Sequence, residues 1–145
     1  MINFHVEKGE TWIDLGANCG YFSQLALETG AKVLAVDADE QNKEIINKLK
    51  KYPNFLGLEL AAIVPSDFKG EVVKFYKRND KMTWKSSLFK SSKATAVAVK
   101  AVRFADLLAD KRIEGELCLK MDIEGAEIEI LKQHNEFSRI KKMVF

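Results

Sequence analysis

Segments with the pattern of buried strands alternate with segments of helical periodicity along the first half of this chain. This alternation is the feature that most constrains its fold. Three segments have the length and apolar content of buried strands: Thr11–Leu15, Lys32–Val36 and Phe55–Ile63. Two segments between them carry apolar residues at helical spacing: Tyr21–Thr29, and a stretch from a cap at Asp39 to Tyr52. The order strand, helix, strand, helix, strand favours an α/β fold with a parallel sheet and helices on both faces.

The second half continues the pattern with more strands and shorter helices. Four further strands are predicted: Glu71–Tyr76, Ala96–Val102, Glu116–Met121 and Ile140–Phe145. Two helices are predicted, Phe104–Asp110 and Gly125–His134, the second with Ile128 and Leu131 facing inward. Between the first two of these strands lies a polar, basic stretch, Lys77–Thr95, which we expect to be a mobile loop, either a lid over the ligand or a loop on the acceptor side.

Composition narrows the functional classes. With 145 residues, 47% of them hydrophobic and 30% charged, the sequence predicts one globular domain over residues 1–145. Its net charge of +2 is too small to indicate a nucleic acid or membrane partner. Two cysteines and two histidines provide neither a disulfide framework nor a metal site. We find no leader and no apolar run of about 18 residues, so we expect a cytoplasmic location.

Basic residues are concentrated in one region. Nine Lys and Arg lie between Lys74 and Arg103, against the single acid Asp80. We interpret them first as a solvated loop, second as a surface that attracts an anionic acceptor, and third as an RNA surface.

A turn rich in small residues follows the first strand, from Gly16 to Gly20. Such a turn lets a ligand approach the backbone and the free N–H groups of the next helix. The G-x-G-x-x-G pattern of dinucleotide sites is absent, and the strand ends near an acid, Asp14, which would repel a pyrophosphate. The ammonium group of S-adenosylmethionine suits that acid better. The alternative is an ordinary left-handed turn of an α/β protein.

A second acid, Asp37, ends the second strand 23 residues after Asp14. An acid at this position can hold the two hydroxyls of a ribose by charge-assisted hydrogen bonds. The alternative is an acid that leads into the next helix, a role that Asp39 and Glu40 fill equally well.

Lys120 interrupts a strand that should be buried on both faces. Buried lysines are rare unless they are paired, so we expect a contact with Asp122, Glu124 or Glu127. Such a pair at the carboxyl end of a strand lies where open α/β sheets place their ligands. The alternative is a surface strand end followed by a helix whose acids complement its dipole.

Two blocks of sequence resemble a known family. WIDLGANCGYFS (Trp12–Ser23) and LKMDIEGAEIEIL (Leu119–Leu131) look like the signature blocks of the FkbM-type, S-adenosylmethionine-dependent methyltransferases. The resemblance covers Val6 to Phe145, although the family more often has Glu where this chain has Asp37. It implies a Rossmann-like class I methyltransferase fold and methyl transfer, mostly to hydroxyl oxygens of glycans or natural products.

The resemblance also implies roles for particular residues. We expect these residues to bind the cofactor: Asp14, Gly16, Ala17, Asn18, Gly20, Tyr21, Asp37, Ala38, Ala61, Ala62 and Asp122. The candidate catalytic residues are Lys120, Asp122 and Glu124, and the choice of general base between the two acids stays open. No metal is expected.

A complete domain of this family continues past its fifth core strand with a helix and an antiparallel strand pair, whereas this sequence ends at Phe145. Either the sequence is a fragment of a longer chain, or it is a compact variant with a C-terminally shortened sheet whose exposed edge a partner, such as a second copy of the chain, covers. A domain that holds the cofactor without turnover is the first alternative function. A nicotinamide dehydrogenase is the second.

Overall fold

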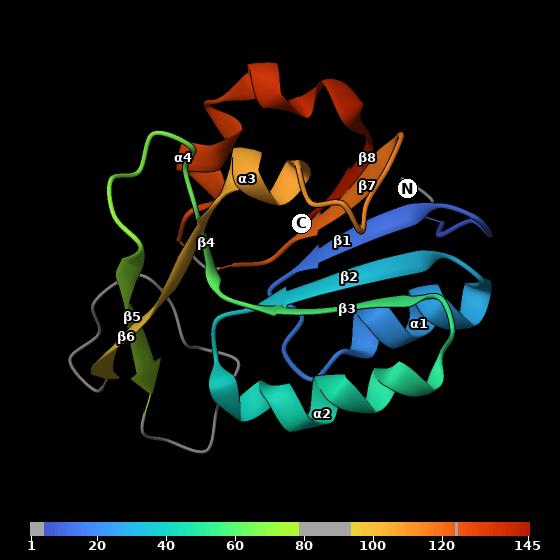
Figure 1. The fold of residues 1–145 in the computed structure, drawn as a ribbon, viewed down its shortest axis with the longest axis horizontal. Helices are drawn as coiled ribbons and strands as arrows, with labels where there is room; N and C mark the ends of the chain where they lie inside the picture. The colour runs from blue at the N-terminus through green and yellow to red at the C-terminus, as the bar shows by residue number, and fades with distance from the viewer. Residues whose placement is uncertain (1–4, 79–93, 124) are drawn as a thin grey trace.

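The computed structural model of the chain describes residues 5–78, 94–123 and 125–145. Its main sheet has the strand order β3-β2-β1-β7-β8, and every neighbouring pair is parallel. These strands are β1 (Thr11–Leu15), β2 (Lys32–Asp37), β3 (Phe55–Leu60), β7 (Leu117–Met121) and β8 (Ile140–Val144). The carboxyl ends of β1, β2 and β3 point to the left in Figure 1. The predicted Rossmann-like α/β class is confirmed.

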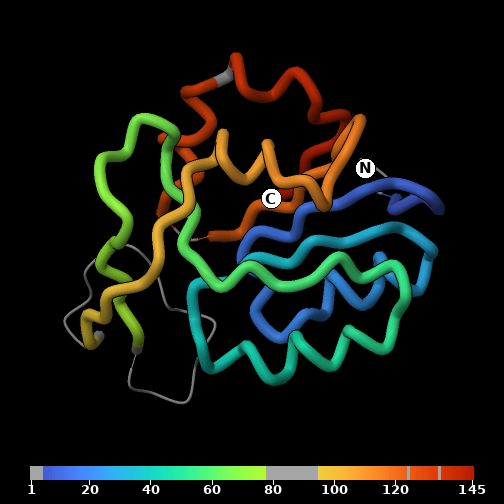
Figure 2. Tube along the Cα trace, in the orientation of Figure 1, coloured from blue at the N-terminus to red at the C-terminus, as the bar shows by residue number. Residues whose placement is uncertain are grey.

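Helices cover both faces of this sheet (Figure 1). The helices α1 (Tyr21–Thr29) and α2 (Lys43–Asn47) lie on one face, and α3 (Phe104–Leu108) and α4 (Glu127–Leu131) on the other. Figure 2 shows the same division along the sequence, with the blue and teal helical segments below the sheet and the orange and red ones above it. Successive residues of β1 therefore enter different cores: Trp12 packs in the cluster with α1, and Ile13 in the cluster with α3 and α4.

A second sheet contains β4 (Ala62–Val64), β6 (Ala94–Arg103) and β5 (Val72–Arg78), in that order. The single strand predicted over Phe55–Ile63 is wrong, because β3 belongs to the main sheet and β4 to the second one. The break falls at Ala61, whose N–H donates to Asp37 O over 2.9 Å. Past that bond the chain leaves the edge of the main sheet and pairs in parallel with β6.

The hairpin formed by β5 and β6 confirms two predicted strands and shortens the predicted loop. Lys77 pairs with Thr95 in the antiparallel ladder, so both ends of the stretch Lys77–Thr95 are strand. Residues 79–93 lie outside the described residues.

Two predicted helices differ from the observed ones. Between Asp39 and Tyr52 the α-helix is limited to α2, flanked by 3-10 turns over Glu40–Asn42 and Lys48–Lys51. Asp39 does cap this segment, since its Oδ1 accepts the N–H of Gln41 over 3.0 Å.

The inward face predicted for the last helix is wrong. Ile128 is 70% exposed and Leu131 36%, whereas Ala126 and Ile130 are buried. The helix α4 has five residues, so it presents one short row to the core, and that row has the spacing i, i+4.

Other side chains follow the expected pattern only in part. Leu25 on α1 and Ile45 on α2 are 51% and 42% exposed, although both lie within the apolar periodicity. Cys118 is a buried residue of the core, and burial raises the pKa of its thiol to about 11. Among the residues that the structure describes, the helices are too short or too polar to traverse a lipid bilayer.

Candidate functional site

The strand order reverses between β1 and β7, because the chain builds outward from β1 first on one side and later on the other. In open α/β sheets the crevice at such a reversal, at the carboxyl ends of the strands, is where ligands bind. The turn after β1 and the segment after β7 meet here. The sequence-predicted site residues of these two segments are thus brought together.

Gly16 makes this meeting possible. Its φ is 75°, and a Cβ built on it would lie 1.9 Å from Asp122 O, which is far inside van der Waals contact. The N–H of Asp122 also donates to Leu15 O over 3.0 Å. Only glycine allows the two backbones to come this close.

The turn continues through two further left-handed residues, Asn18 with φ 52° and Gly20 with φ 78°. Gly20 is the N-cap of α1 and has no side chain that could cap the helix. The first N–H groups of a helix have no acceptor within it, and the backbone N–H of Ser23 bonds to the carboxylate of Asp14. The turn thus brings the N-terminus of α1 to the crevice.

Asp14 lies beneath this turn. Its side chain is fully buried and accepts a hydrogen bond of 2.6 Å from the Ser23 hydroxyl. Burial raises the pKa of Asp14, and the ammonium group of Lys120 and the bond from Ser23 oppose that shift. Nζ of Lys120 is 3.1 Å from Asp14 Oδ1, so the positive partner of this acid is supplied by the chain itself.

Lys120 contacts a carboxylate, as predicted, but the nearest one belongs to Asp14, which was not among the three predicted partners. Asp122 Oδ2 is 4.0 Å from Nζ, against 3.1 Å for Asp14 Oδ1. Glu127 instead accepts the N–H groups of Ile123 and Gly125 over 3.0 and 2.7 Å. Glu124 lies outside the described residues.

Lys120 also binds the turn directly. Its Nζ donates to Gly16 O over 2.7 Å, and its side chain is 14% exposed. The Asp122 side chain is 65% exposed. The lysine is thus largely buried against the turn, while the Asp122 side chain is exposed to solvent.

Asp37 is buried at the end of β2, with both oxygens held by neutral donors. Oδ2 accepts the N–H of Asn18 over 2.7 Å; Oδ1 accepts the N–H of Asp39 over 2.8 Å and Asn42 Nδ2 over 3.2 Å. Burial raises the pKa of Asp37, and the hydrogen bonds from Asp39, Asn18 and Asn42 lower it. Asp37 therefore connects the turn after β1 to the segment after β2.

The remaining predicted cofactor residues lie around these two acids. Ala17 and Ala61 are bonded to the end of β2 by their N–H groups, to Val36 O and Asp37 O. Ala62 is buried, Ala38 is half-buried, and Tyr21 is 77% exposed as the first residue of α1.

Charge at this edge of the sheet is unbalanced. Four aspartates gather here: Asp14, Asp37, Asp39 and Asp122. Two lysines lie within 4.0 Å of three of them, Lys120 near Asp14 and Asp122, and Lys77 near Asp39. Among the described side chains of this edge, carboxylates exceed ammonium groups by two, which favours a ligand that carries positive charge.

Sequence reasoning missed three contributors to the site: Ser23, Asn42 and Lys77. Ser23 is fully buried on the inner face of α1, so a polar residue within that apolar row was a usable signal. No sequence pattern connects Lys77 to Asp39, because Lys77 lies in the second sheet, Asp39 lies in the loop after β2, and 38 positions separate them.

A shallow pocket of about 400 Å³ lies away from this edge, between the segment after β4 and the end of α4. Its polar side chains are already bonded to one another: Ser66 Oγ to Glu136, and Gln133 Nε2 to Asp67. It adds no reactive group to the site.

The comparisons identify one family. The family model described as "Methyltransferase FkbM domain" matches residues 14–145, from the aspartate under the turn to the end of the chain. The comparisons with curated proteins and with solved structures found no match. The matched range includes every residue that we have placed at this edge of the sheet.

Proposed function

The chain belongs to the FkbM methyltransferase family, and we propose that it transfers the methyl group of S-adenosylmethionine to a hydroxyl oxygen of a glycan or natural-product acceptor. One observation carries the choice of cofactor: the N-terminus of α1, whose N-cap is a glycine, and the buried acid Asp37 meet at the same crevice. S-adenosylmethionine has a carboxylate, which suits the helix N-terminus, and a ribose diol, which suits Asp37.

The residues present fit this cofactor in charge as well. Carboxylates outnumber ammonium groups among the described residues of the edge, and S-adenosylmethionine carries an ammonium and a sulfonium against one carboxylate. Asp37 accepts three hydrogen bonds, whereas a carboxylate has about four lone-pair positions. It retains capacity for a ribose hydroxyl.

When bound, the cofactor supplies an electrophilic methyl group. Asp37 would hold the ribose and the N-terminus of α1 the carboxylate. Asp14 and Lys120 would support the turn from below, because Lys120 donates to Gly16 O in the turn and forms an ion pair with the buried Asp14. Asp122 is exposed above the turn, where a carboxylate can take the proton of an attacking hydroxyl. Glu124 stays its alternative in that role.

The basic residues of the β5–β6 hairpin support an anionic acceptor. Lys74 is exposed on this hairpin, which lies toward the carboxyl ends of β1, β2 and β3 (Figure 1). Positive charge beside the crevice would steer such an acceptor toward it.

Two measurements test the proposal. Calorimetric titration with S-adenosylhomocysteine should give saturable binding, and titration with NAD should give none. A screen of hydroxylated acceptors with isotopically labelled S-adenosylmethionine should then give methyl transfer to oxygen. Binding of NAD alone would refute the proposed cofactor. Cofactor binding with no transfer to any acceptor would favour a binding-only domain.

A further inference from the structure

An ion pair joins the β5–β6 hairpin to the loop that follows β2. Nζ of Lys77 is 2.6 Å from Asp39 Oδ1, and the two side chains are 23% and 4% exposed. Lys77 lies in β5 of the second sheet and Asp39 in the loop after β2 of the main sheet, so this contact bridges elements that share no strand pairing. An ion pair so shielded from water is stronger than an exposed one of equal length.

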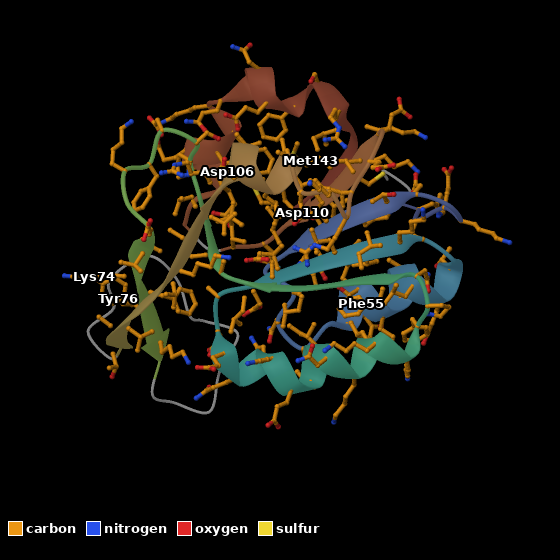
Figure 3. All side chains as sticks on the ribbon, viewed as in Figure 1. Phe55, Lys74, Tyr76, Asp106, Asp110 and Met143 are labelled. Atoms are coloured by element: carbon orange, nitrogen blue, oxygen red, sulfur yellow. The ribbon has the colours of Figure 1, made fainter. Side chains whose placement is uncertain are left out.

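The register of β5 directs Lys77 inward. Side chains alternate along a strand, so Phe75 and Lys77 share one face and Lys74 lies on the other. Phe75 is 7% exposed, whereas Lys74 points away from the body of the molecule (Figure 3). Lys77 is thus held against the molecule by the same face that buries Phe75.

Asp39 transmits this contact to the proposed cofactor site. Its Oδ1 accepts Lys77 and the N–H of Gln41, and its own N–H donates to Asp37 Oδ1. Asp37 Oδ2 in turn accepts the N–H of Asn18. A continuous chain of polar contacts therefore runs from the hairpin through Asp39 and Asp37 to the turn after β1.

The positive charge of Lys77 lies where it can reduce the repulsion between two neighbouring acids. Asp37 and Asp39 are buried acids two positions apart; burial raises the pKa of Asp37 most, and the negative charge of Asp39 adds to that increase. A cation on the far side of Asp39 offsets that repulsion and fixes the Asp39 carboxylate in its capping position.

We propose that Lys77 is a positioning residue for the cofactor: through Asp39 it holds the loop that presents Asp37, so the hairpin and the cofactor stabilise each other. This inference rests on the proposed function, because the ligand whose affinity it controls is S-adenosylmethionine or its product. Binding and hairpin position are then linked reciprocally, as any coupling between two sites must be.

Calorimetric titration with S-adenosylhomocysteine, at fixed pH and salt, tests the proposal on five variants. Lys77→Met should weaken binding by about fivefold or more, and Lys77→Arg should retain most of the affinity. Lys100→Met is the matched control, since Lys100 lies on the same hairpin and also forms a 2.6 Å ion pair to the main sheet, with Glu59. It should bind like the wild type.

The fourth variant distinguishes positioning from a general loss of structure. Asp39→Asn keeps an acceptor for the N–H of Gln41 but removes the charge that Lys77 contacts. In that background, Lys77→Met should change the affinity by less than twofold, because its partner is already gone. Thermal unfolding of each variant shows that the chain is folded, and Asp39→Asn breaks the pair independently should Lys77→Met not fold.

The outcomes separate the two hypotheses. If the wild type binds S-adenosylhomocysteine and Lys77→Met and Lys100→Met bind it equally well, the role of Lys77 is overturned but the proposed function is not. A full effect of Lys77→Met in the Asp39→Asn background would overturn it as well. A wild type that binds no S-adenosylhomocysteine would refute the proposed function, and this inference with it.

Discussion

Replacing Lys120 with methionine should destabilise the chain in a manner that depends on pH. The substitution removes the ion pair of 3.1 Å to Asp14 and the hydrogen bond of 2.7 Å to Gly16 O. Asp14 is fully buried and would keep only its bonds from Ser23. Breaking a buried pair from one side costs about 3–5 kcal/mol, because an uncompensated charge stays behind.

Proton uptake by Asp14 limits this cost. Protonating a carboxyl group with the ordinary pKa of 3.8 costs about 4.4 kcal/mol at pH 7 and about 1.6 kcal/mol at pH 5. Burial raises the pKa of Asp14 in the folded chain, so the folded state retains a proton that the unfolded state has lost. Stability then falls as the pH rises from 3.8 through the raised value, and losing Lys120 extends that window upward.

Urea unfolding at pH 5 and pH 7 measures the effect. The free energy of unfolding of Lys120→Met should fall below the wild type by about 3–4 kcal/mol at pH 7 and by about 1–2 kcal/mol at pH 5. Lys132→Met is the control, since its ion pair with Glu129 is exposed on both sides. Adding Asp14→Asn should restore part of the loss. A deficit that is equal at both pH values, or no larger than that of the control, would refute this reasoning.

Three further substitutions test the site. Gly16→Ala should unfold the chain or lower its melting temperature far more than Gly9→Ala, because the new Cβ would meet Asp122 O at 1.9 Å whereas Gly9, also at positive φ, has open space; equal losses in thermal unfolding would contradict this. Asp37→Ala should weaken S-adenosylhomocysteine by about 1.5–3 kcal/mol in a titration, and an unchanged affinity in the folded variant would remove Asp37 from the ribose site. Asp122→Asn should lower kcat by about 10²–10⁴-fold with little change in cofactor affinity, and a parallel loss of both would assign it to binding.

The sequence predicts the main sheet well because its information is local. Buried parallel strands appear as short apolar runs, and the ranges expected for β1, β2 and β7 agree with the observed ones to within one residue at each end. The turn from Gly16 to Gly20 was also recognisable, since only glycines between a strand and a helix leave room for such a close approach.

The break at Ala61 could not be predicted in the same way. The run Phe55–Ile63 is uniformly apolar apart from Glu59, so periodicity gives no sign that its two halves enter different sheets. What separates them is a non-local choice: Ala61 bonds to Asp37 O, and β4 then pairs with β6, about 40 residues later in the chain. The prediction of the inward face of α4 was wrong for a related reason. In a helix of only five residues, tertiary packing and not the apolar periodicity decides which side chains are buried.

The partner of Lys120 shows where the local reasoning reaches its limit. Sequence proximity suggested Asp122, Glu124 or Glu127, yet the register of the sheet places Asp14 directly opposite Lys120 on the neighbouring strand. Burial then decides between the acids, because Asp14 is fully buried and Asp122 is 65% exposed, and a charge pair gains most where water is absent. Asp122 is thereby left exposed, with a contact of 4.0 Å to Lys120. The pairing that the sequence could not show thus leaves Asp122 available for the role of general base that we propose for it.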